Sequence, residues 1–492
     1  MKEFIISISL IICFPMSVTA KDIDFEEKIF GDHHLYLESS ITKRRFKHES
    51  ITAALEKIRR QANFKVSQAG ESVEGRSLNL VRYGKGDIKV LLWSQMHGDE
   101  STATMALLDI FNFLAASDQF DSFRDTLASR LTLYFVPMLN PDGAERFQRR
   151  NAIGIDLNRD ALRREFSESR VLKSLVDKIK PDFGFNLHDQ KPFYTAGRSA
   201  KPATISFLAP PFDYERSVDD GRLDAIRLIS LLNRRLQQFI PGQVGKYSDE
   251  FEPRAFGDNI QKWGASTVLV ESGGYPDDPE KQQIRKLNFV LLLSAFKAIA
   301  EKEYESEDPE GYEAIPNNEE YLFHLLIREA AYSVKGHKYR IDLGINRKEI
   351  DAEDHLSFHQ RSFIEDMGDL SVFWGYEEID AAGLEIVEGK AWPENFESVR
   401  SISMDTAVSI LKKGYTEVVV REKPENFHHG LPLTVLYNTA SRSNSIQKNR
   451  NPNFLLKGDG KYQYAIVNGF IFNLNTGKNN VLNGLVEKGY ED

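Results

Sequence analysis

Apolar runs alternate with helical patterns between residues 70 and 300, and this alternation limits the folds that the chain can adopt. Several of the runs are nearly all apolar, which is typical of strands buried on both faces. Such strands joined by helices form an α/β domain with a largely parallel sheet. The predicted strands are 78–83, 89–94, 131–138, 182–187 and 268–271, and the predicted helices are 52–61, 105–115, 161–179, 222–239 and 285–301.

A second region follows an acidic stretch. Residues 301–320 read EKEYESEDPEGYEAIPNNEE, and their like charges, prolines and glycine favour an exposed linker. One more helix is expected at 319–334, followed by short β-rich segments with turn dipeptides such as Asn468-Gly469 and Asn483-Gly484. The predicted organisation is a signal peptide at 1–20, an α/β domain at 21–300, an acidic linker and helix at 301–334, and a β-rich domain of unknown role at 335–492.

The first twenty residues have the pattern of a secretory signal. Lys2 precedes the apolar stretch FIISISLIICFPMSV, and a small-residue cleavage site ends at Ala20. This stretch is shorter than the roughly 20 apolar residues that span a membrane. We therefore expect cleavage after Ala20, a secreted or periplasmic protein, and no stable membrane insertion. The only cysteine, Cys13, lies in this leader, so the mature chain would have no disulfide or thiol chemistry.

The charge balance excludes one class of partner. Lys and Arg number 63 against 73 for Asp and Glu, which gives a net charge of −10. Proteins that bind DNA or RNA need a positive field to attract phosphates. Nucleic acid is therefore not expected as a partner, and the oligomeric state is left open by the sequence.

Candidate metal ligands lie where two predicted strands end. The segment QMHGDE follows strand 89–94, at the carboxyl end where open α/β sheets bind ligands. His97 and Glu100, three residues apart, would present an imidazole nitrogen and a carboxylate to one divalent ion. His188 ends strand 182–187 and is a candidate for the third ligand of a His₂Glu zinc site. The pair His355 and His359 also has metal-compatible spacing but no evident third ligand, so both are interpreted as surface residues.

Two further motifs supply charged groups for catalysis. The run RRNAIGIDLNRD begins at Arg149 and contains Arg159. Because guanidinium groups pair with carboxylates, one arginine would bind a substrate carboxylate while another faces an oxygen that becomes negative; a surface basic patch is the alternative. Glu271 ends strand 268–271, where a general base for a metal-bound water would sit.

Taken together, the motifs resemble the zinc carboxypeptidases of the carboxypeptidase A family, across about residues 50–300. The resemblance is carried by GESVEGR at 70–76, then HGDE, NPDG, the RxNAxGxDLNR run, and the histidine and glutamate at strand ends. It implies a carboxypeptidase-like fold with a mixed, mostly parallel sheet covered by helices on both faces.

The resemblance also implies roles for individual residues. The implied ligands of one zinc per chain are His97, Glu100 and His188, with a water in the fourth position. Arg149 would polarise the scissile carbonyl and stabilise the oxyanion, and Asn158 with Arg159 would bind the terminal carboxylate of the substrate. Glu271 would take a proton from the water and return it to the leaving amine.

The sequence departs from the family at two places. The nearest candidate for the mobile tyrosine that closes over the substrate is Tyr247, and the segment after Asn158-Arg159 lacks the usual aromatic, proline-rich continuation. The pocket for the terminal side chain should involve residues 247–257, whose mixed charges favour neither a basic nor an apolar terminal residue.

The implied function is zinc-dependent hydrolysis of a C-terminal peptide bond, which releases one amino acid from an exported peptide or a peptidoglycan stem peptide. An N-acyl amino acid deacylase of the aspartoacylase or succinylglutamate desuccinylase type shares several of the motifs, but NPDG, the GxSxxGR opening and the predicted export weigh against it. A catalytically inactive binding protein on the same fold is a third hypothesis, against which the retained ligands and base argue.

Overall fold

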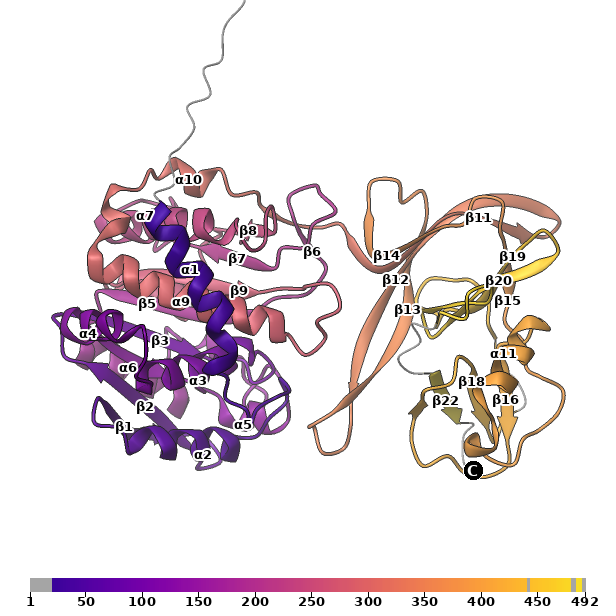
Figure 1. The fold of residues 1–492 in the computed structure, drawn as a ribbon, viewed down its shortest axis with the longest axis horizontal. Coiled ribbons are helices and arrows are strands. Elements are labelled where there is room, and N and C mark those ends of the chain that lie inside the picture. Colours follow the sequence, from indigo (N-terminus) through magenta and orange to yellow (C-terminus); the bar gives the residue numbers. More distant parts are fainter. Residues whose placement is uncertain (1–19, 440–442, 479–483, 489–492) are drawn as a thin grey trace, which may run out of the picture.

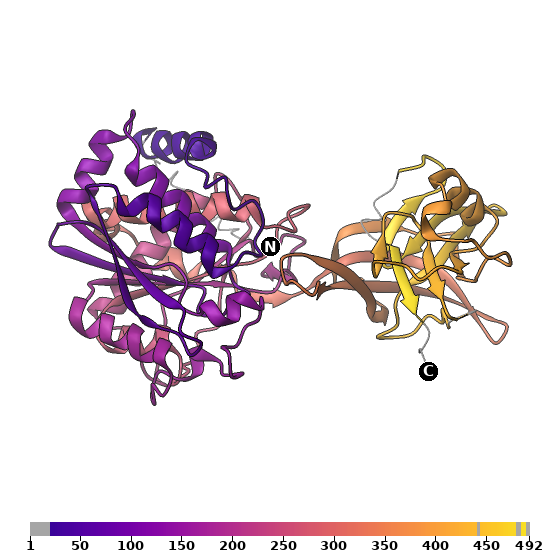
Figure 2. The ribbon, with the colours of Figure 1, turned by 90° about the horizontal axis from the view of Figure 1, so that it is seen from below.

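The structure is a computed structural model that describes residues 20–439, 443–478 and 484–488. The predicted signal peptide lies outside these residues except for Ala20, where helix α1 (Ala20–Asp32) begins, and the turn residue Asn483 also lies outside them. Within the described part of the chain, no helix is long and apolar enough to cross a membrane. Figure 1 and Figure 2 show a larger α/β region and, beside it, a smaller β-rich region.

The α/β region is built on an eight-stranded sheet with the strand order β1-β2-β4-β3-β5-β9-β7-β8. The four strands at its centre are parallel, while the pairings β1–β2, β2–β4 and β7–β9 are antiparallel. The prediction of a mixed sheet with a parallel centre is confirmed. The bounds are β1 (Phe64–Glu71), β2 (Ser77–Gly84), β3 (Ile88–Ser94), β4 (Leu131–Val136), β5 (Phe183–Asp189), β7 (Ile205–Leu208), β8 (Val244–Lys246) and β9 (Ser266–Ser272).

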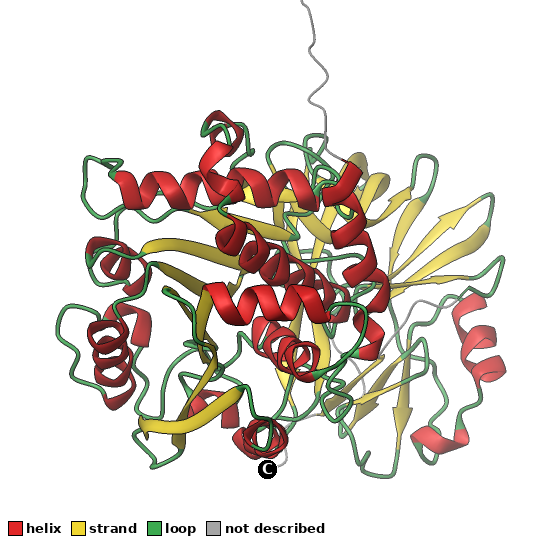
Figure 3. Cartoon of the chain, turned by 60° about the vertical axis from the view of Figure 1, so that its left-hand side comes forward, coloured by secondary structure: helices red, strands yellow, loops and turns green. Residues whose placement is uncertain are grey.

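Helices cover both faces of this sheet, and Figure 3 shows several of them lying against the strands. Alternate residues of β3 point to opposite faces, so that Val90 and Leu92 join one core cluster while Leu91 and Trp93 join another. The first cluster includes α2 (His48–Arg59), α3 (Thr102–Ala115), α4 (Asp121–Arg130), α7 (Asp220–Leu236) and α9 (Gln282–Glu301), and the second includes α6 (Ser167–Ile179) and α8 (Phe256–Lys262). Short elements are η1 (His33–Leu35), α5 (Pro141–Glu145), η2 (Leu157–Arg159) and β6 (Tyr194–Ala196).

One predicted helix is shorter than expected. The pattern over 161–179 is helical only from Ser167 onward, in α6. The Asp160 carboxylate accepts hydrogen bonds from the backbone N–H groups of Glu165 and Phe166, which holds the intervening residues in turns. Local side-chain bonding of this kind competes with the helix.

The acidic stretch after α9 is exposed at more than half of its residues, but three of its side chains pack into the core of the α/β region. It contains η3 (Glu303–Ser306) and α10 (Glu310–Glu313), and Tyr304, Tyr312 and Ile315 are buried. Its acidic side chains do not simply repel each other, because several of them pair with basic residues of α7 and α9. The domain boundary near residue 300 stays a prediction.

The helix predicted at 319–334 is also wrong. This stretch forms β10 (Asn318–Glu320) and β11 (Leu322–Val334). β11 lies between β12 (His337–Asp351), with which it is antiparallel, and β14 (Trp374–Asp380), with which it is parallel. Tertiary pairing on both sides outweighs the helix-compatible composition of the segment.

The remaining part of the chain is β-rich, as predicted. One sheet has the order β13-β12-β11-β15-β19-β20-β21, with β14 also paired to β11, and a second has the order β16-β18-β22-β17. The short β-rich segments expected here include residues 417–420, which form β16, and residues 462–467, which form most of β20. The bounds are β13 (Phe358–Gly368), β15 (Glu385–Glu388), η4 (Val399–Ser401), α11 (Met404–Lys412), β16 (Glu417–Val420), β17 (His428–His429), β18 (Thr434–Tyr437), β19 (Asn453–Gly458), β20 (Lys461–Val467), β21 (Phe470–Asn473) and β22 (Gly484–Lys488).

Candidate metal centre and active site

Three neighbouring parallel strands end at one site. The loop after β3 contains His97, while β5 and β9 carry His188 and Glu271 at their carboxyl ends. His188 and Glu271 are register partners on adjacent strands, and Glu100 lies in the turn just before α3. The side chains that the sequence placed at strand ends are therefore brought together at one edge of the sheet.

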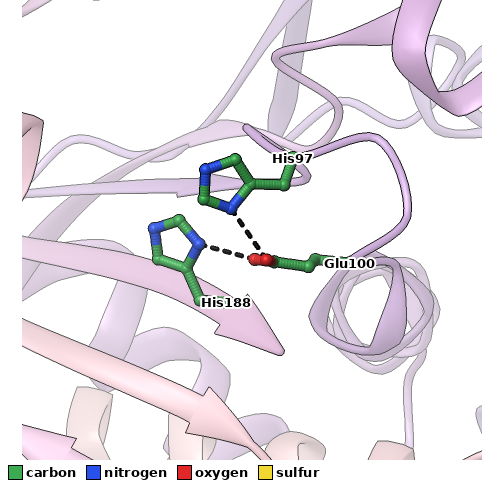
Figure 4. Close-up of side chains that lie close together, drawn as sticks. All are labelled: His97, Glu100 and His188. Atoms are coloured by element: carbon green, nitrogen blue, oxygen red, sulfur yellow. Dashed lines mark hydrogen bonds and ion pairs between the residues drawn. The ribbon is translucent and has the colours of Figure 1, made fainter. Parts of the chain in front are cut away.

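His97 and His188 converge on the carboxylate of Glu100 (Figure 4). His97 Nδ1 lies 2.8 Å from Glu100 Oε1, and His188 Nδ1 lies 2.6 Å from Glu100 Oε2. All three side chains are buried, and one ligand atom from each lies within 4.8 Å of the others. Two imidazole nitrogens and one carboxylate form the donor set of catalytic zinc sites.

Outer contacts orient these candidate ligands. The Nε2 atom of His97 lies 3.1 Å from the Asp156 carboxylate, which leaves Nδ1 directed at Glu100. Such carboxylate partners fix the orientation of a metal-binding imidazole. His188 Nε2 is buried and has no hydrogen-bond partner, so Nδ1 is the nitrogen of that ring that is engaged at the site. The donor set and its orientation fit a zinc ion.

The electrostatics of the site favour a positive charge beside Glu100. Burial alone would raise the pKa of Glu100, but His97 and His188 hold it well below its usual range. Burial would lower the pKa of His97, yet Glu100 and Asp156 raise it to about 9. The carboxylates thus attract a cation to this point, either a proton or a metal ion.

The pKa of Glu271 is shifted in the opposite direction. Burial, followed by the charge of Glu100, raises it well above the ordinary value for a glutamate. A carboxyl group with a raised pKa can take up a proton near neutral pH, which a general base must do. Glu271 is 8% exposed and lines the same pocket as the three candidate ligands.

Residues of the GESVEGR motif at 70–76 form hydrogen bonds with the NPDG motif at 140–143. The buried Asp142 carboxylate accepts hydrogen bonds from the Ser72 hydroxyl and the Arg76 guanidinium, both at 2.7 Å. The Asn140 side chain caps α5 by accepting from the N–H of Gly143 at 2.9 Å. A Cβ on Gly98 would lie 2.1 Å from the backbone of Gly143, so only glycine lets the HGDE loop pack against NPDG. These motifs position the site rather than line it.

Arg149 reaches the pocket beside the candidate ligands. Its guanidinium donates to Glu100 Oε1 at 3.1 Å and to Asp156 Oδ2 at 3.2 Å. These two carboxylates hold the guanidinium at the edge of the candidate metal site. A fixed positive charge at this position can stabilise a negative oxygen that develops during acyl transfer.

The site opens into a pocket of about 270 Å³. The pocket brings together all the predicted substrate-binding residues. Asn158 accepts a hydrogen bond from the Phe256 backbone through Oδ1, while the Arg159 guanidinium lies 3.3 Å from Glu252. Burial and the Glu271 charge raise the pKa of Tyr247 to about 12. The residues around the pocket include Arg149, Asn158, Arg159, Gln190, Tyr194, Tyr247, Glu252, Asp258 and Glu271.

Several site residues were not assigned a role from the sequence. Asp156 stands in the DLNR run, and only the fold shows that it contacts His97. Tyr194 and Asp258 line the pocket without a sequence motif to mark them. Asp189, next to His188, also lines the pocket, and its carboxylate accepts from the Thr102 hydroxyl at 2.6 Å and lies 3.2 Å from Lys281 Nζ. His359 lies on β13 in the β-rich region.

Comparison with known proteins concerns the site residues that precede residue 184 in the sequence. The family model described as zinc carboxypeptidase matches residues 51–183. Residues 51–183 belong to the zinc carboxypeptidase family. The matched segment of this metal-dependent hydrolase family contains His97, Glu100, Arg149, Asn158 and Arg159, and the fold adds His188 and Glu271 from beyond it.

Individual relatives of the zinc carboxypeptidase segment match shorter stretches. Carboxypeptidase 2 of Trichophyton rubrum is 31% identical over 116 residues, which cover 23% of this chain and 20% of that protein. Carboxypeptidase SOL1 of Arabidopsis thaliana is 35% identical over 65 residues, 13% of each chain. The chain thus spans a fifth or less of the length of these two relatives. Among solved structures, a metallo-carboxypeptidase from Burkholderia cenocepacia is similar to this protein. The superposed residues make up 54% of this chain and 71% of the Burkholderia chain, with 20% sequence identity and a TM-score of 0.44.

Proposed function

We propose that the protein is a zinc-dependent carboxypeptidase that hydrolyses a C-terminal peptide bond and releases the terminal amino acid. The observation that carries this proposal is the convergence of His97, Glu100 and His188 beside the buried Glu271. The family match over residues 51–183 supports the same chemistry. The proposed substrate is an exported peptide or a peptidoglycan stem peptide, in keeping with the predicted signal peptide and a secreted or periplasmic location.

His97, Glu100 and His188 would hold one zinc ion per chain. When bound, zinc would supply a Lewis acid that polarises the scissile carbonyl and makes water a better nucleophile near neutral pH. The side chains of the pocket then have to bind the substrate, direct the water and move protons.

Glu271 is assigned the proton transfers. Its carboxylate would accept a proton from the attacking water through an Oε atom and later give that proton to the nitrogen of the leaving amine. Its raised pKa supports this role, because the group then holds the proton until the amine departs.

Four other residues are assigned to the substrate. The Arg149 guanidinium would face the carbonyl oxygen and stabilise the negative charge that develops on it. Arg159 and Asn158 would bind the terminal carboxylate, for which a guanidinium is well suited because its N–H groups form paired hydrogen bonds. Tyr247 would close over the substrate terminus.

The proposal is tested with the purified protein and defined substrates. A peptide with a free C-terminus should lose its terminal amino acid, and a chelator should abolish this release until zinc is restored. The amidated form of the same peptide should be cleaved far more slowly, since it lacks the carboxylate. Cleavage of N-acetyl amino acids in preference to peptides would favour the deacylase, and metal binding without turnover of peptides, muropeptides or acyl amino acids would favour a binding protein.

A further inference from the structure

The segment that connects the two regions is bonded to the walls of the pocket. β10 pairs with β6, whose first residue, Tyr194, lines the pocket. The backbone N–H of Lys246 donates to the carbonyl oxygen of Pro316 at 2.7 Å, next to the pocket residue Tyr247. The pocket is therefore supported by residues that lie beyond the last helix of the α/β region.

Asn318 extends this support to the end of β5. Its Nδ2 donates to Gln190 Oε1 at 2.7 Å, and its Oδ1 accepts from the Ser206 hydroxyl at 2.8 Å. Gln190 lines the pocket two residues after His188. The Asn318 side chain of β10 thus fixes the side chain of the pocket residue Gln190 by a hydrogen bond.

Tyr376 of the β-rich region contacts the loop that follows β5. This residue of β14 donates its hydroxyl hydrogen to the Pro192 carbonyl oxygen at 2.7 Å. A Cβ on Gly274 would lie 2.1 Å from the Tyr376 hydroxyl oxygen and 2.9 Å from Pro192 Cβ, so the hydroxyl is the nearest of the groups that fill the space beside Gly274. Pro192 follows β5 and Gly274 follows β9, and these strands carry His188 and Glu271 near their carboxyl ends.

Aromatic contacts surround the Tyr376 hydroxyl. The His324 ring lies 5.0 Å from the Phe193 ring, edge to face, and 6.1 Å from the Tyr376 ring. Burial and the nearby Arg347 lower the pKa of His324 to about 3, so this ring is neutral and packs as an aromatic group. The loop after β5 is thus held by a hydrogen bond and by ring packing, both from the β-rich region.

We propose that Tyr376 is a positioning residue that holds the loop after β5 against the loop after β9. These two loops follow β5 and β9, which carry His188 and Glu271 near their carboxyl ends. The residues after β5 include Gln190, Lys191 and Tyr194, which line the pocket. A pocket binds substrate well only when its walls are held in place by surrounding contacts. The effect on catalysis rests on the proposed function, whereas the effect on the loop does not.

Hydrogen–deuterium exchange tests the effect on the loop in the full-length protein. Tyr376→Phe keeps the ring and removes only the hydrogen bond to Pro192, so exchange in the peptide covering 190–197 should rise about 3- to 10-fold. Tyr332→Phe is the matched control, because it removes another tyrosine hydroxyl bond of the same sheet, to the Glu388 carboxylate. Equal exchange at 190–197 in the two variants would overturn the proposal.

Kinetics test the effect on substrate. Tyr376→Phe should lower kcat/KM about 3- to 10-fold, mainly by raising KM, with zinc content and Tm close to those of the parent. An unchanged KM together with a lowered Tm would mean a merely structural role and would overturn the proposal. If the parent turns over none of the substrates, the proposed function fails, while the exchange measurement still decides whether Tyr376 holds the loop.

A double variant tests whether the hydroxyl fills the space beside Gly274. Gly274→Ala should push the loops apart and lower kcat/KM more than Tyr376→Phe does. Adding Tyr376→Phe to Gly274→Ala removes the atom that lies nearest to the new methyl group, while Pro192 Cβ at 2.9 Å stays, so the double variant should recover part of the activity that Gly274→Ala loses. Losses that simply add would contradict the packing on which the proposal depends.

Discussion

Two buried histidines, His97 in the α/β region and His324 in the β-rich region, have pKa values that are shifted in opposite directions. His97, beside Glu100 and Asp156, has its pKa raised to about 9, whereas His324, beside Arg347, has its pKa lowered to about 3. Burial disfavours the charged imidazole in both places. The difference lies in the neighbours, since Glu100 and Asp156 together outweigh burial at His97, whereas Arg347 adds to the effect of burial at His324. At His188 the Glu100 carboxylate opposes burial, but burial outweighs it and the pKa is lowered.

The same contrast applies to pairs of histidines. His97 and His188 share the Glu100 carboxylate, while His359 and His428 stack on each other at a centroid distance of 5.4 Å. Burial and His428 lower the pKa of His359. Within the described parts of the chain, the group of His97, Glu100 and His188 is the one with three potential ligand atoms close together.

The largest expected effect is a loss of bound zinc, which should follow from replacing His97 but not from replacing His359. His97→Ala removes a proposed zinc ligand that Glu100 and Asp156 hold in place, so bound zinc should fall from about one per chain to nearly none and activity should be lost. His359→Ala should leave both unchanged. Zinc is measured by elemental analysis of protein that has been dialysed against metal-free buffer. If His97→Ala still bound one zinc per chain, the assignment of His97 as a zinc ligand would be wrong.

The next effect separates catalysis from metal binding. Glu271→Gln keeps the size of the side chain but cannot accept a proton, so kcat should fall by about two to four orders of magnitude with zinc retained. Glu168→Gln is the control, since Glu168 is also a buried glutamate with a raised pKa but contacts Val73 and Ser167 outside the pocket. Near-parental turnover in Glu271→Gln would remove Glu271 from the mechanism.

A smaller effect concerns recognition of the substrate terminus. Arg159→Ala should raise KM for peptides with a free C-terminus about 10- to 100-fold and leave little difference between free and amidated peptides. Arg254→Ala is matched to it, because Arg254 also pairs with Glu252 but does not line the pocket. The KM values of both variants are compared for the two peptide forms. A KM that rises equally in both variants would assign the effect to Glu252 instead.

The strand ends could be predicted from the sequence because apolar runs and the residues directly after them are local signals. His97, Glu100, His188 and Glu271 were all identified in this way. The contact of Asp156 with His97 joins residues 59 apart, and no spacing rule relates them. Such contacts depend on how loops pack, which a single sequence does not encode locally.

The error at residues 319–334 has a related cause. A run such as LFHLLIREAAYSV fits a helix by composition, but its pairing with β12 and β14 decides its conformation. Tyr376 was not noticed in the sequence for the same reason, since it meets Pro192 and Gly274 only after the two regions pack together. Long-range pairing, rather than propensity, determines both.

The last expected effect is on stability rather than activity, and concerns a buried carboxyl group at which burial outweighs the nearby positive charge of Arg159. Burial raises the pKa of Asp258 from 3.8 to about 7, whereas Glu100, between two histidines, is shifted downward. Below pH 3.8, Asp258 is protonated in the folded and the unfolded chain alike. Between pH 3.8 and about 7 the unfolded chain releases this proton first, so Asp258 makes the folded state less stable as the pH rises, and above about 7 the loss is constant.

Asp258→Asn should therefore become more stable than the parent as the pH rises from about 4 to about 7, by up to about 1.4 kcal/mol for each unit of pKa shift. Asparagine keeps the oxygen that accepts the Glu252 N–H and has no proton to release. The measurement is denaturant unfolding of both proteins at a series of pH values. Asp213→Asn is the control, since hydrogen bonds from Ser217 lower the pKa of the exposed Asp213 and its contribution should be constant above pH 5. A difference between Asp258→Asn and the parent that does not change from pH 4 to 7 would mean that the aspartate is ionised throughout, so that burial at this position is offset by a cation after all.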